Sequence, residues 1–291
     1  MMTDLEELNE LFALEESLSF EMHPSGLTLG RVSLPDCRAE FTLHGAHVLS
    51  YQPANRDRSI LFVSDQAIFE HGKPIRGGIP ICFPWFGSNA EDASLPAHGW
   101  ARTSEWELIE TARSSNQVIV RMALSQDEIQ VTIELVFGAE LSVDVAVINN
   151  RDVPLSFEIA LHTYFQIHSI DDVEINGLET VPFVDQLKNV TLPGDNFAIR
   201  FTEETDRIYQ GIVEQITLME NGANSRVCVV PRGSQSTVVW NPWIEKSKRM
   251  ADFGDEEYLR MCCVETANVR ANKIVLAPGE SHTTGVTLQA S

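Results

Sequence analysis

The stretch of sequence that decides the fold is QVIVRMALSQDEIQVTIELVFGAELSVDVAVINN, residues 117–150. Apolar and polar side chains alternate along three runs within it, at 117–124, 129–137 and 141–148. Such alternation is typical of a strand with one buried face and one solvated face. Turn-forming residues such as Gly138 separate the runs, so the stretch predicts an antiparallel meander.

Comparable short runs lie on both sides of this meander, at 40–51, 60–63 and 155–161, and helical patterns are rare between them. Sandwiches and barrels of this length, 291 residues, commonly fold as one unit. We therefore expect an all-β protein, a large antiparallel β-sandwich. Residues 18–291 are expected to form one domain, with residues 1–17 as a helical appendage.

The appendage is expected from an amphipathic pattern near the N-terminus. Leu5, Leu8 and Leu11 recur at three-residue spacing with acidic residues between them. This spacing predicts one short helix, for which Thr3 or Asp4 would supply the N-cap. We interpret the helix as a packing element rather than a functional one.

Charge and composition exclude several classes of partner. The sequence is 43% hydrophobic and 22% charged, which is the balance of a globular protein with a sizeable core. It has 42 acidic and 21 basic residues, and its formal net charge is −21. A field of that sign repels nucleic acids and anionic membranes, so we expect neither as a partner.

The sequence also predicts a cytoplasmic location. No apolar run reaches the length needed to cross a bilayer, and the first 16 residues are acidic, unlike a secretory signal. An odd number of cysteines without CxxC spacing favours a reducing compartment over a disulfide framework. The five cysteines are Cys37, Cys82, Cys228, Cys262 and Cys263.

Two segments break the strand pattern, 69–102 and 238–253, and long irregular segments often carry binding groups. In the first, Arg76 precedes Gly77 and Gly78, which would let the backbone come close to a ligand. An arginine can hold phosphate oxygens in bidentate fashion.

The first irregular segment also carries Trp85 and Trp100, whose rings could face a sugar. The alternative is a glycine-kinked strand with its aromatic side chains in the core and its arginines paired with surface acids. The residues alone leave both interpretations open.

Two further segments carry groups suited to proton transfer. In an extended chain His162 and Tyr164 share one face, opposite Thr163, so an imidazole and a phenol could line one pocket. Glu265 interrupts the apolar run 262–267, and an inward-pointing carboxylate needs a partner or a function. The alternatives are a structural histidine and a glutamate on a solvated sheet face.

Other chemistries lack their minimum residues. His44 and His47 are three apart, which would place them on opposite faces of a regular strand, and no HxH or HExxH motif is present. We therefore expect no metal site. The sequence also lacks a GxSxG elbow, a P-loop and a GxGxxG fingerprint.

Taken together and in this order, the motifs resemble those of the aldose 1-epimerase superfamily, and specifically its bacterial hexose-6-phosphate mutarotase branch. The resemblance implies a galactose-mutarotase-like β-supersandwich that holds a sugar in a cleft on its concave side. It covers most of the chain after the N-terminal helix. The matching segments are 76–87, 95–102, 161–165, 205–209, 239–242 and 264–267.

The resemblance also implies roles for individual residues. The catalytic histidine of the family falls on His162, and its catalytic glutamate falls on Glu265. Two positions depart from the family pattern: Ala97 stands where some relatives have glutamine, and Trp85 where some have a smaller or polar residue. The substrate-contacting residues, including the phosphate-contacting arginines, map to Arg76, Arg102, Asp206 and His98.

The expected function is interconversion of the α and β anomers of a hexose 6-phosphate, with glucose 6-phosphate as the leading substrate. Glutamate has a pKa of about 4.3 and suits the base, whereas histidine at about 6.5 suits the acid. We thus expect Glu265 to act as base and His162 as acid, with the carboxylate favouring protonated His162. A monomer without a cofactor is expected.

Two alternatives stay open from the sequence. A non-catalytic carbohydrate-binding sandwich would use the same aromatic and arginine side chains without bringing His162 and Glu265 to one ligand. An epimerase of free sugars such as galactose would lack converging arginines in its cleft.

Overall fold

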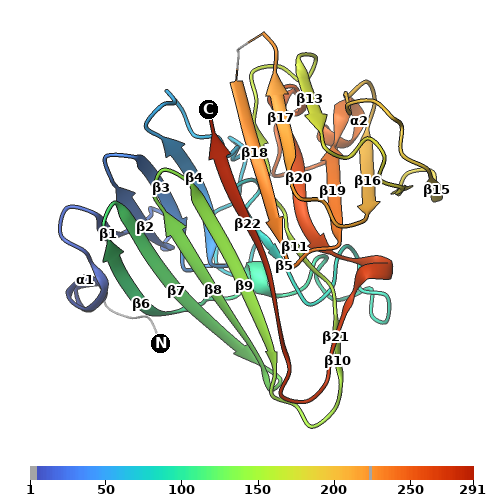
Figure 1. Ribbon diagram of the computed structural model, residues 1–291. Coiled ribbons are helices and arrows are strands. Elements are labelled where there is room, and N and C mark those ends of the chain that lie inside the picture. The colour runs from blue at the N-terminus through green and yellow to red at the C-terminus, as the bar shows by residue number, and fades with distance from the viewer. Residues whose placement is uncertain (1–4, 223–224) are drawn as a thin grey trace.

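The computed structural model describes residues 5–222 and 225–291, and antiparallel strands dominate it (Figure 1). Within these residues the strands form two eight-stranded sheets, one four-stranded sheet and one two-stranded ribbon. This architecture confirms the predicted all-β class. Among the same residues, no helix has the length and apolar character required to pass through a bilayer.

The first large sheet, which we call the meander sheet, contains the stretch that decided the fold. Its spatial order is β13-β17-β18-β22-β9-β8-β7-β6. Its strands are β6 (Glu107–Ser114), β7 (Gln117–Gln126), β8 (Ile129–Phe137), β9 (Leu141–Asn149), β13 (Val173–Asn176), β17 (Ile216–Glu220), β18 (Ser225–Arg232) and β22 (Ser281–Ala290).

The second large sheet, which we call the site sheet, has the order β15-β14-β16-β19-β20-β11-β5, and β12 also pairs with β20. Its strands are β5 (Ile81–Cys82), β11 (Ile159–Leu161), β12 (Tyr164–Gln166), β14 (Phe183–Asp185), β15 (Val190–Leu192), β16 (Thr205–Gln210), β19 (Ser236–Asn241) and β20 (Met261–Asn268). Helix α2 (Trp243–Ser247) directly follows β19 in the chain.

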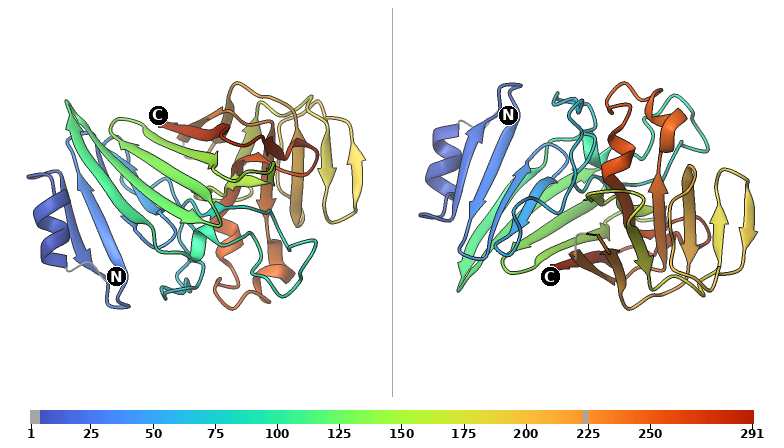
Figure 2. Two further views of the ribbon diagram at one scale, coloured as in Figure 1. Left: turned by 90° about the horizontal axis from the view of Figure 1, so that it is seen from below. Right: turned by 90° about the horizontal axis from the view of Figure 1, so that it is seen from above.

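The four-stranded sheet lies at the end of the molecule that also holds α1 (Leu5–Phe12), whereas β15 lies at the opposite end (Figure 2). The remaining strands are β1 (Leu18–Met22), β2 (Thr28–Ser33), β3 (Cys37–Thr42), β4 (His47–Pro53) and the ribbon of β10 (Leu155–Phe157) and β21 (Ile274–Leu276).

Helix α1 confirms the predicted N-terminal helix. Leu8 is buried, and the Asn9 side chain fastens the helix to β1: it donates to the Phe20 carbonyl and accepts from the Phe20 N–H, both at 2.9 Å. The proposed caps, Thr3 and Asp4, lie outside the described residues.

Most predicted runs match strands closely, but three differ. The run 129–137 coincides with β8, whereas 40–51 is divided between β3 and β4 because the chain reverses at Gly45 and Ala46, both with positive φ. The run 60–63 forms only isolated bridges. The run 155–161 is interrupted at Glu158, whose carboxylate accepts backbone hydrogen bonds from distant segments of the chain.

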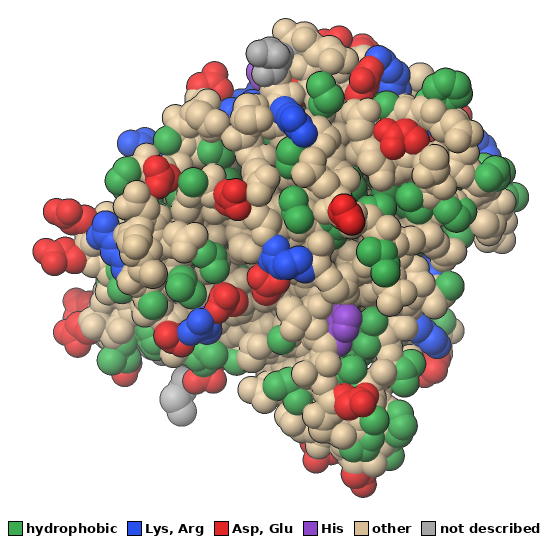
Figure 3. Space-filling view, in the orientation of Figure 1, with side chains coloured by type: hydrophobic (Ala, Val, Ile, Leu, Met, Phe, Trp, Pro, Cys, Tyr) green, Lys and Arg blue, Asp and Glu red, His purple; other side chains and the backbone are tan. Residues whose placement is uncertain are grey.

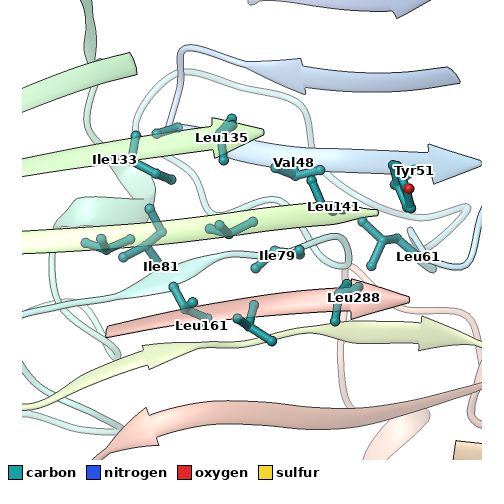
Figure 4. Packing of buried hydrophobic residues seen from close by; sticks show 14 of the residues in the cluster. Val48, Tyr51, Leu61, Ile79, Ile81, Ile133, Leu135, Leu141, Leu161 and Leu288 are labelled. Carbon is teal, nitrogen blue, oxygen red and sulfur yellow. The ribbon is translucent and has the colours of Figure 1, made fainter. Parts of the chain in front are cut away.

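A continuous apolar core fills the space beneath the meander sheet. In Figure 4, Leu135 on β8, Leu141 on β9 and Leu288 on β22 extend toward side chains such as Ile81 and Leu161 from the site sheet. All five side chains are fully buried. The core thus holds the site sheet in a fixed position relative to the meander sheet.

The opposite face of the meander sheet faces solvent and mixes charged with apolar side chains. Figure 3 shows acidic and basic side chains interspersed over this side of the molecule. Arg121 on β7 pairs with Glu110 and Glu134 from its neighbouring strands, and Arg232 on β18 pairs with Asp144 on β9. Some of the acidic side chains on this face are therefore neutralised locally by ion pairs.

Candidate active site

A cavity of about 340 Å³ lies on the site sheet, on the side away from the core. Five of the six site residues predicted from the sequence line it, and within the described part of the chain the exception is Arg102. The lining residues are Arg76, Phe86, Gly87, His98, His162, Gln186, Asp206, Val238, Trp240, Lys246, Met250, Glu265 and Arg270.

Strand β20 places Glu265 at this cavity. The strand lies between β19 on one side and β11 and β12 on the other, and all eight of its residues are buried. Val264 points into the core, so Glu265, the next residue, points to the cavity. With 1% exposure, Glu265 does not face a solvated sheet surface. The structure therefore excludes that alternative.

His162 lies between β11 and β12, opposite Glu265. Its Nε2 is 3.3 Å from Oε1 of Glu265, and its backbone N–H donates to the Pro80 carbonyl at 3.0 Å. The imidazole stacks on the Tyr164 ring, with centroids 4.7 Å apart and an interplanar angle of 11°. His162 and Tyr164 therefore share one face of the chain, as predicted.

Burial controls the protonation of this pair. It lowers the pKa of His162 well below its usual value, an effect reinforced by His98 and the positive charges of Arg102 and Arg76. It raises the pKa of Glu265 well above its usual value; Asp206 adds to this and Arg102 opposes it. Desolvation of the buried pair thus opposes the attraction by which the carboxylate would favour protonated His162.

Each shift disfavours the charged form of its group, and the two groups are close enough to share one proton. One member can then act as an acid while the other acts as a base. Among the described residues, Nδ1 of His162 and Oε2 of Glu265 are buried without a hydrogen-bond partner. A buried polar atom without a partner is costly, so a bound hydroxyl group would be stabilised here.

His98 presents a neutral donor to the same cavity. The Gly87 N–H donates to its Nδ1 at 3.3 Å, so in the neutral ring Nε2 carries the proton. Burial, together with Arg102 and Arg76, lowers the pKa of His98 to about 3. The next residue, Gly99, has positive φ, and a Cβ there would lie 1.9 Å from the Phe83 carbonyl oxygen. Only glycine fits this turn.

Arg76 lies on the cavity wall but already has partners. It forms an ion pair with Asp252 at 3.1 Å, and its Nη1 donates to the Tyr164 hydroxyl at 3.1 Å. Gly77 and Gly78 do not line the cavity in the described structure, contrary to our expectation of a close approach to ligand. A Cβ on Gly77 would lie 2.4 Å from the Phe62 carbonyl oxygen, so its role is close packing of backbone.

Arg102 is not among the residues that line the cavity in the described structure. It lies on the 3-10 turn Ala101–Thr103 and donates to the Ala97 carbonyl at 2.7 Å. Burial lowers its pKa. It is nevertheless close enough to act electrostatically on His98, His162 and Glu265.

A hydrogen-bonded chain that sequence reasoning missed extends across the cavity wall. Arg270 donates to Oε1 of Gln186 at 3.0 Å, and Nε2 of Gln186 donates to Asp206 at 2.6 Å. Lys246 lies 4.0 Å from the same Asp206 carboxylate. Lys246 falls in the predicted irregular segment 238–253, but no local pattern marks Gln186 or Arg270.

The aromatic residues of the cavity also differ from those expected. Trp85 and Trp100 do not line it within the described residues; Trp85 donates to the Pro96 carbonyl, and Trp100 packs edge-on against Phe83. Trp240 on β19 and Phe86 line it instead. The alternative of core aromatic packing thus holds for Trp100.

Comparisons with known proteins identify the family of the chain. The family model described as Aldose 1-epimerase matches residues 32–289. A protein of Cenchrus ciliaris named "Putative glucose-6-phosphate 1-epimerase" is 35% identical over 276 residues, which cover 88% of this chain and 82% of the relative. A protein of the same name from Escherichia coli is 30% identical, over 86% of each chain.

Among solved structures, one from Salmonella typhimurium described as a "putative mutarotase" superimposes with a TM-score of 0.89 at 26% identity, over 97% of this chain and 96% of the other. The family match spans far more than half of the chain and includes each of the six predicted site residues. The chain therefore belongs to the aldose 1-epimerase family, enzymes that interconvert the anomers of sugars.

Proposed function

We propose that this enzyme interconverts the α and β anomers of a hexose 6-phosphate, with glucose 6-phosphate as the leading substrate. The observation that carries the proposal is the approach of His162 Nε2 to Glu265 Oε1, 3.3 Å, at the wall of one cavity that also holds three cationic side chains. We propose further that it acts without a cofactor, as a monomer in the cytoplasm.

The proton transfers follow from the position of the pair. Opening the ring requires removal of the proton from the O1 hydroxyl and delivery of a proton to O5. Glu265 serves as the base at O1 and His162 as the acid at O5, with the roles reversed when the ring closes. The substrate hydroxyl would donate to the unpartnered Oε2 of Glu265, and this hydrogen bond favours the carboxylate over the neutral acid. The proton shared by the pair then lies on His162, 3.3 Å away, from which it is delivered to O5 as Glu265 takes the O1 proton.

The phosphate is assigned to the cationic side of the cavity. Arg76, Lys246 and Arg270 line it, against the two acidic residues Asp206 and Glu265. Surface charges beyond roughly 8 Å are screened at physiological salt, so these local cations outweigh the net charge of −21. Arg102 does not line the cavity in the described structure, and we assign it an electrostatic role on the catalytic pair rather than a phosphate contact.

The acid role is tested with His162→Asn. Saturation-transfer NMR on the anomers of glucose 6-phosphate should show that the exchange rate constant falls by about 10²- to 10⁴-fold, the usual contribution of a positioned proton donor. The far-ultraviolet circular dichroism should not change. Near-normal exchange in the folded variant would remove His162 from the mechanism.

The phosphate assignment is tested with Arg76→Ala. Arg76 uses three of its five N–H donors on Asp252 and Tyr164, which leaves two for a phosphate oxygen. Losing a charged hydrogen bond of about 1.5–3 kcal/mol should raise KM for glucose 6-phosphate by about 10- to 100-fold, and exchange of free glucose should change much less. Arg76→Lys should recover part of the loss, and Arg121→Ala, on the meander sheet, is the control. An unchanged preference for the phosphorylated sugar would contradict the role of Arg76.

A further inference from the structure

A cluster of metal-ligand type lies outside the active site, formed by His44, His71 and Glu105. His44 is in the turn between β3 and β4, His71 is in the first irregular segment, and Glu105 precedes β6. Nδ1 of each imidazole lies 2.9 Å from the same glutamate oxygen, Oε1, and the three ligand atoms all lie within 4.8 Å of one another.

The hydrogen bonds made by Nε2 of each imidazole determine which ring nitrogen carries the proton in the neutral ring. Nε2 of His44 lies 2.8 Å from the Lys73 carbonyl, which only accepts, so Nε2 carries a proton. Nε2 of His71 faces the Gly26 carbonyl at 3.4 Å in the same way. In the neutral rings both Nδ1 atoms therefore direct lone pairs at the Glu105 oxygen. Either a proton shared with the carboxylate or a metal ion satisfies such a group of acceptors.

We propose that His44, His71 and Glu105 bind one divalent transition-metal ion, with Zn²⁺ as the leading candidate. Two imidazole nitrogens and one carboxylate oxygen suit this class, whereas Ca²⁺ and Mg²⁺ prefer oxygen ligands alone. Around a tetrahedral Zn²⁺ with bonds of about 2.0–2.1 Å, ligand atoms lie about 3.3 Å apart. The two Nδ1–Oε1 distances, 2.9 Å each, are shorter than this, so the side chains would move slightly apart around the ion.

Solvent can reach the cluster, and a hydrogen bond holds the orientation of its buried histidine. The side chains of His71 and Glu105 are 55% and 51% exposed, so an ion can enter from solvent and a water molecule can complete its coordination. His44 is 1% exposed, and its hydrogen bond to the Lys73 carbonyl is the outer contact that metal-bound histidines usually make.

A bound ion would fasten three segments that reach the active site. Lys73 precedes Arg76 by three residues, and the turn that holds His44 is bonded to the segment after Arg102 through the Gly45 N–H and the Ser104 carbonyl, at 2.7 Å. The ion therefore has a structural role, since no ligand of the cluster lines the cavity within the described residues.

The proposal is tested on metal-stripped protein by calorimetric titration with ZnCl₂ and by the visible absorption of the CoCl₂ complex. One ion should bind per chain and raise Tm. His71→Asn removes an exposed ligand without disturbing the core, and it should weaken binding at least about tenfold and abolish the cobalt spectrum. Glu105→Gln should weaken binding comparably.

The matched control is His168→Asn. His168 is also half-exposed and also directs Nδ1 at a carboxylate, that of Glu220 at 3.1 Å, but without a second histidine. This variant should bind as the unaltered protein does. Absence of binding, or binding that survives His71→Asn and is lost in His162→Asn, would overturn the proposal. The anomer assay does not enter this test, so its result stands apart from the proposed function.

Discussion

Strands β8 and β20 are both interior strands of eight-stranded sheets, yet their side chains are buried in opposite ways. Buried and half-buried residues alternate along all nine residues of β8, whereas all eight residues of β20 are buried. The outer face of β8 is solvated, while β20 has the core on one face and the cavity on the other. Alternation of buried and half-buried residues thus marks β8 as a strand that supports the fold. Burial of every residue marks β20 as the strand that carries the site.

The buried polar residues of β20 sharpen this distinction. Asn268 is hydrogen-bonded to the Gly233 carbonyl and the Thr284 hydroxyl, at 2.8 and 2.9 Å. Glu265, three residues earlier, keeps one carboxylate oxygen without a partner in the described structure. A buried polar group is usually satisfied, so the one left unsatisfied is the one available to a ligand.

The largest expected effect comes from the buried glutamate. Glu265→Gln should lower anomer exchange of glucose 6-phosphate by about 10²- to 10⁴-fold, because the amide cannot accept the O1 proton. The free energy of unfolding should stay the same or rise, since burial disfavours the ionised carboxyl group. Exchange measured by NMR and unfolding measured in urea separate these two effects.

Glu134→Gln on β8 is the matched control for that variant. Glu134 is 37% exposed and pairs with Arg121 at 2.6 Å. Exchange should be unchanged, and unfolding should become easier by less than about 1 kcal/mol, as for most exposed ion pairs. Equal loss of exchange in both variants would show that the distinction between the two strands has no functional meaning.

The next effect in size tests the alternation of β8 itself. Leu135→Ala should lower the free energy of unfolding by about 2–5 kcal/mol, because Leu135 is fully buried in the core and its removal leaves a cavity. Val136→Ala, one residue on and facing outward, should cost less than about 1 kcal/mol. Urea titrations of the two variants measure both values, and similar losses would contradict the assignment of faces.

The same contrast explains how much of the molecule could be predicted from sequence. The run 129–137 was placed correctly because alternation reports burial on a two-sided sheet directly. The run 155–161 was not, because Glu158 interrupts it through hydrogen bonds to the Phe86 and Arg270 backbone N–H groups, and a local pattern does not contain such long-range contacts.

The site was predictable in part for a related reason. The shared face of His162 and Tyr164 follows from strand geometry, but the roles given to His162 and Glu265 came from family resemblance. Gln186 and Arg270 were missed because they lie in a turn and at the start of a short 3-10 helix, respectively, and meet only in the folded chain. The positions of Arg76 and Arg102 relative to the cavity likewise depend on tertiary packing that no spacing encodes.

The smallest of these effects concerns how the free energy of unfolding depends on pH in the acid range, and it comes from a buried residue of the site. The pKa of His98 is lowered from the usual 6.5 to about 3 by burial and nearby arginines, so the folded protein keeps this ring neutral while the unfolded chain takes up a proton. The stability that neutral His98 contributes is fully present above pH 6.5 and is lost as the pH falls toward 3.

Replacing His98 by glutamine should therefore make unfolding less sensitive to acid. Between pH 6 and pH 4 the free energy of unfolding of His98→Gln should fall less steeply than that of the unaltered protein, by about 1.4 kcal/mol per pH unit. Above pH 7 the two curves should run parallel, which serves as the internal control. The free energy of unfolding of both proteins is measured by urea unfolding at each pH. If the two curves were parallel over the whole range, His98 would titrate alike in the folded and unfolded chains, and its burial would not contribute to acid unfolding.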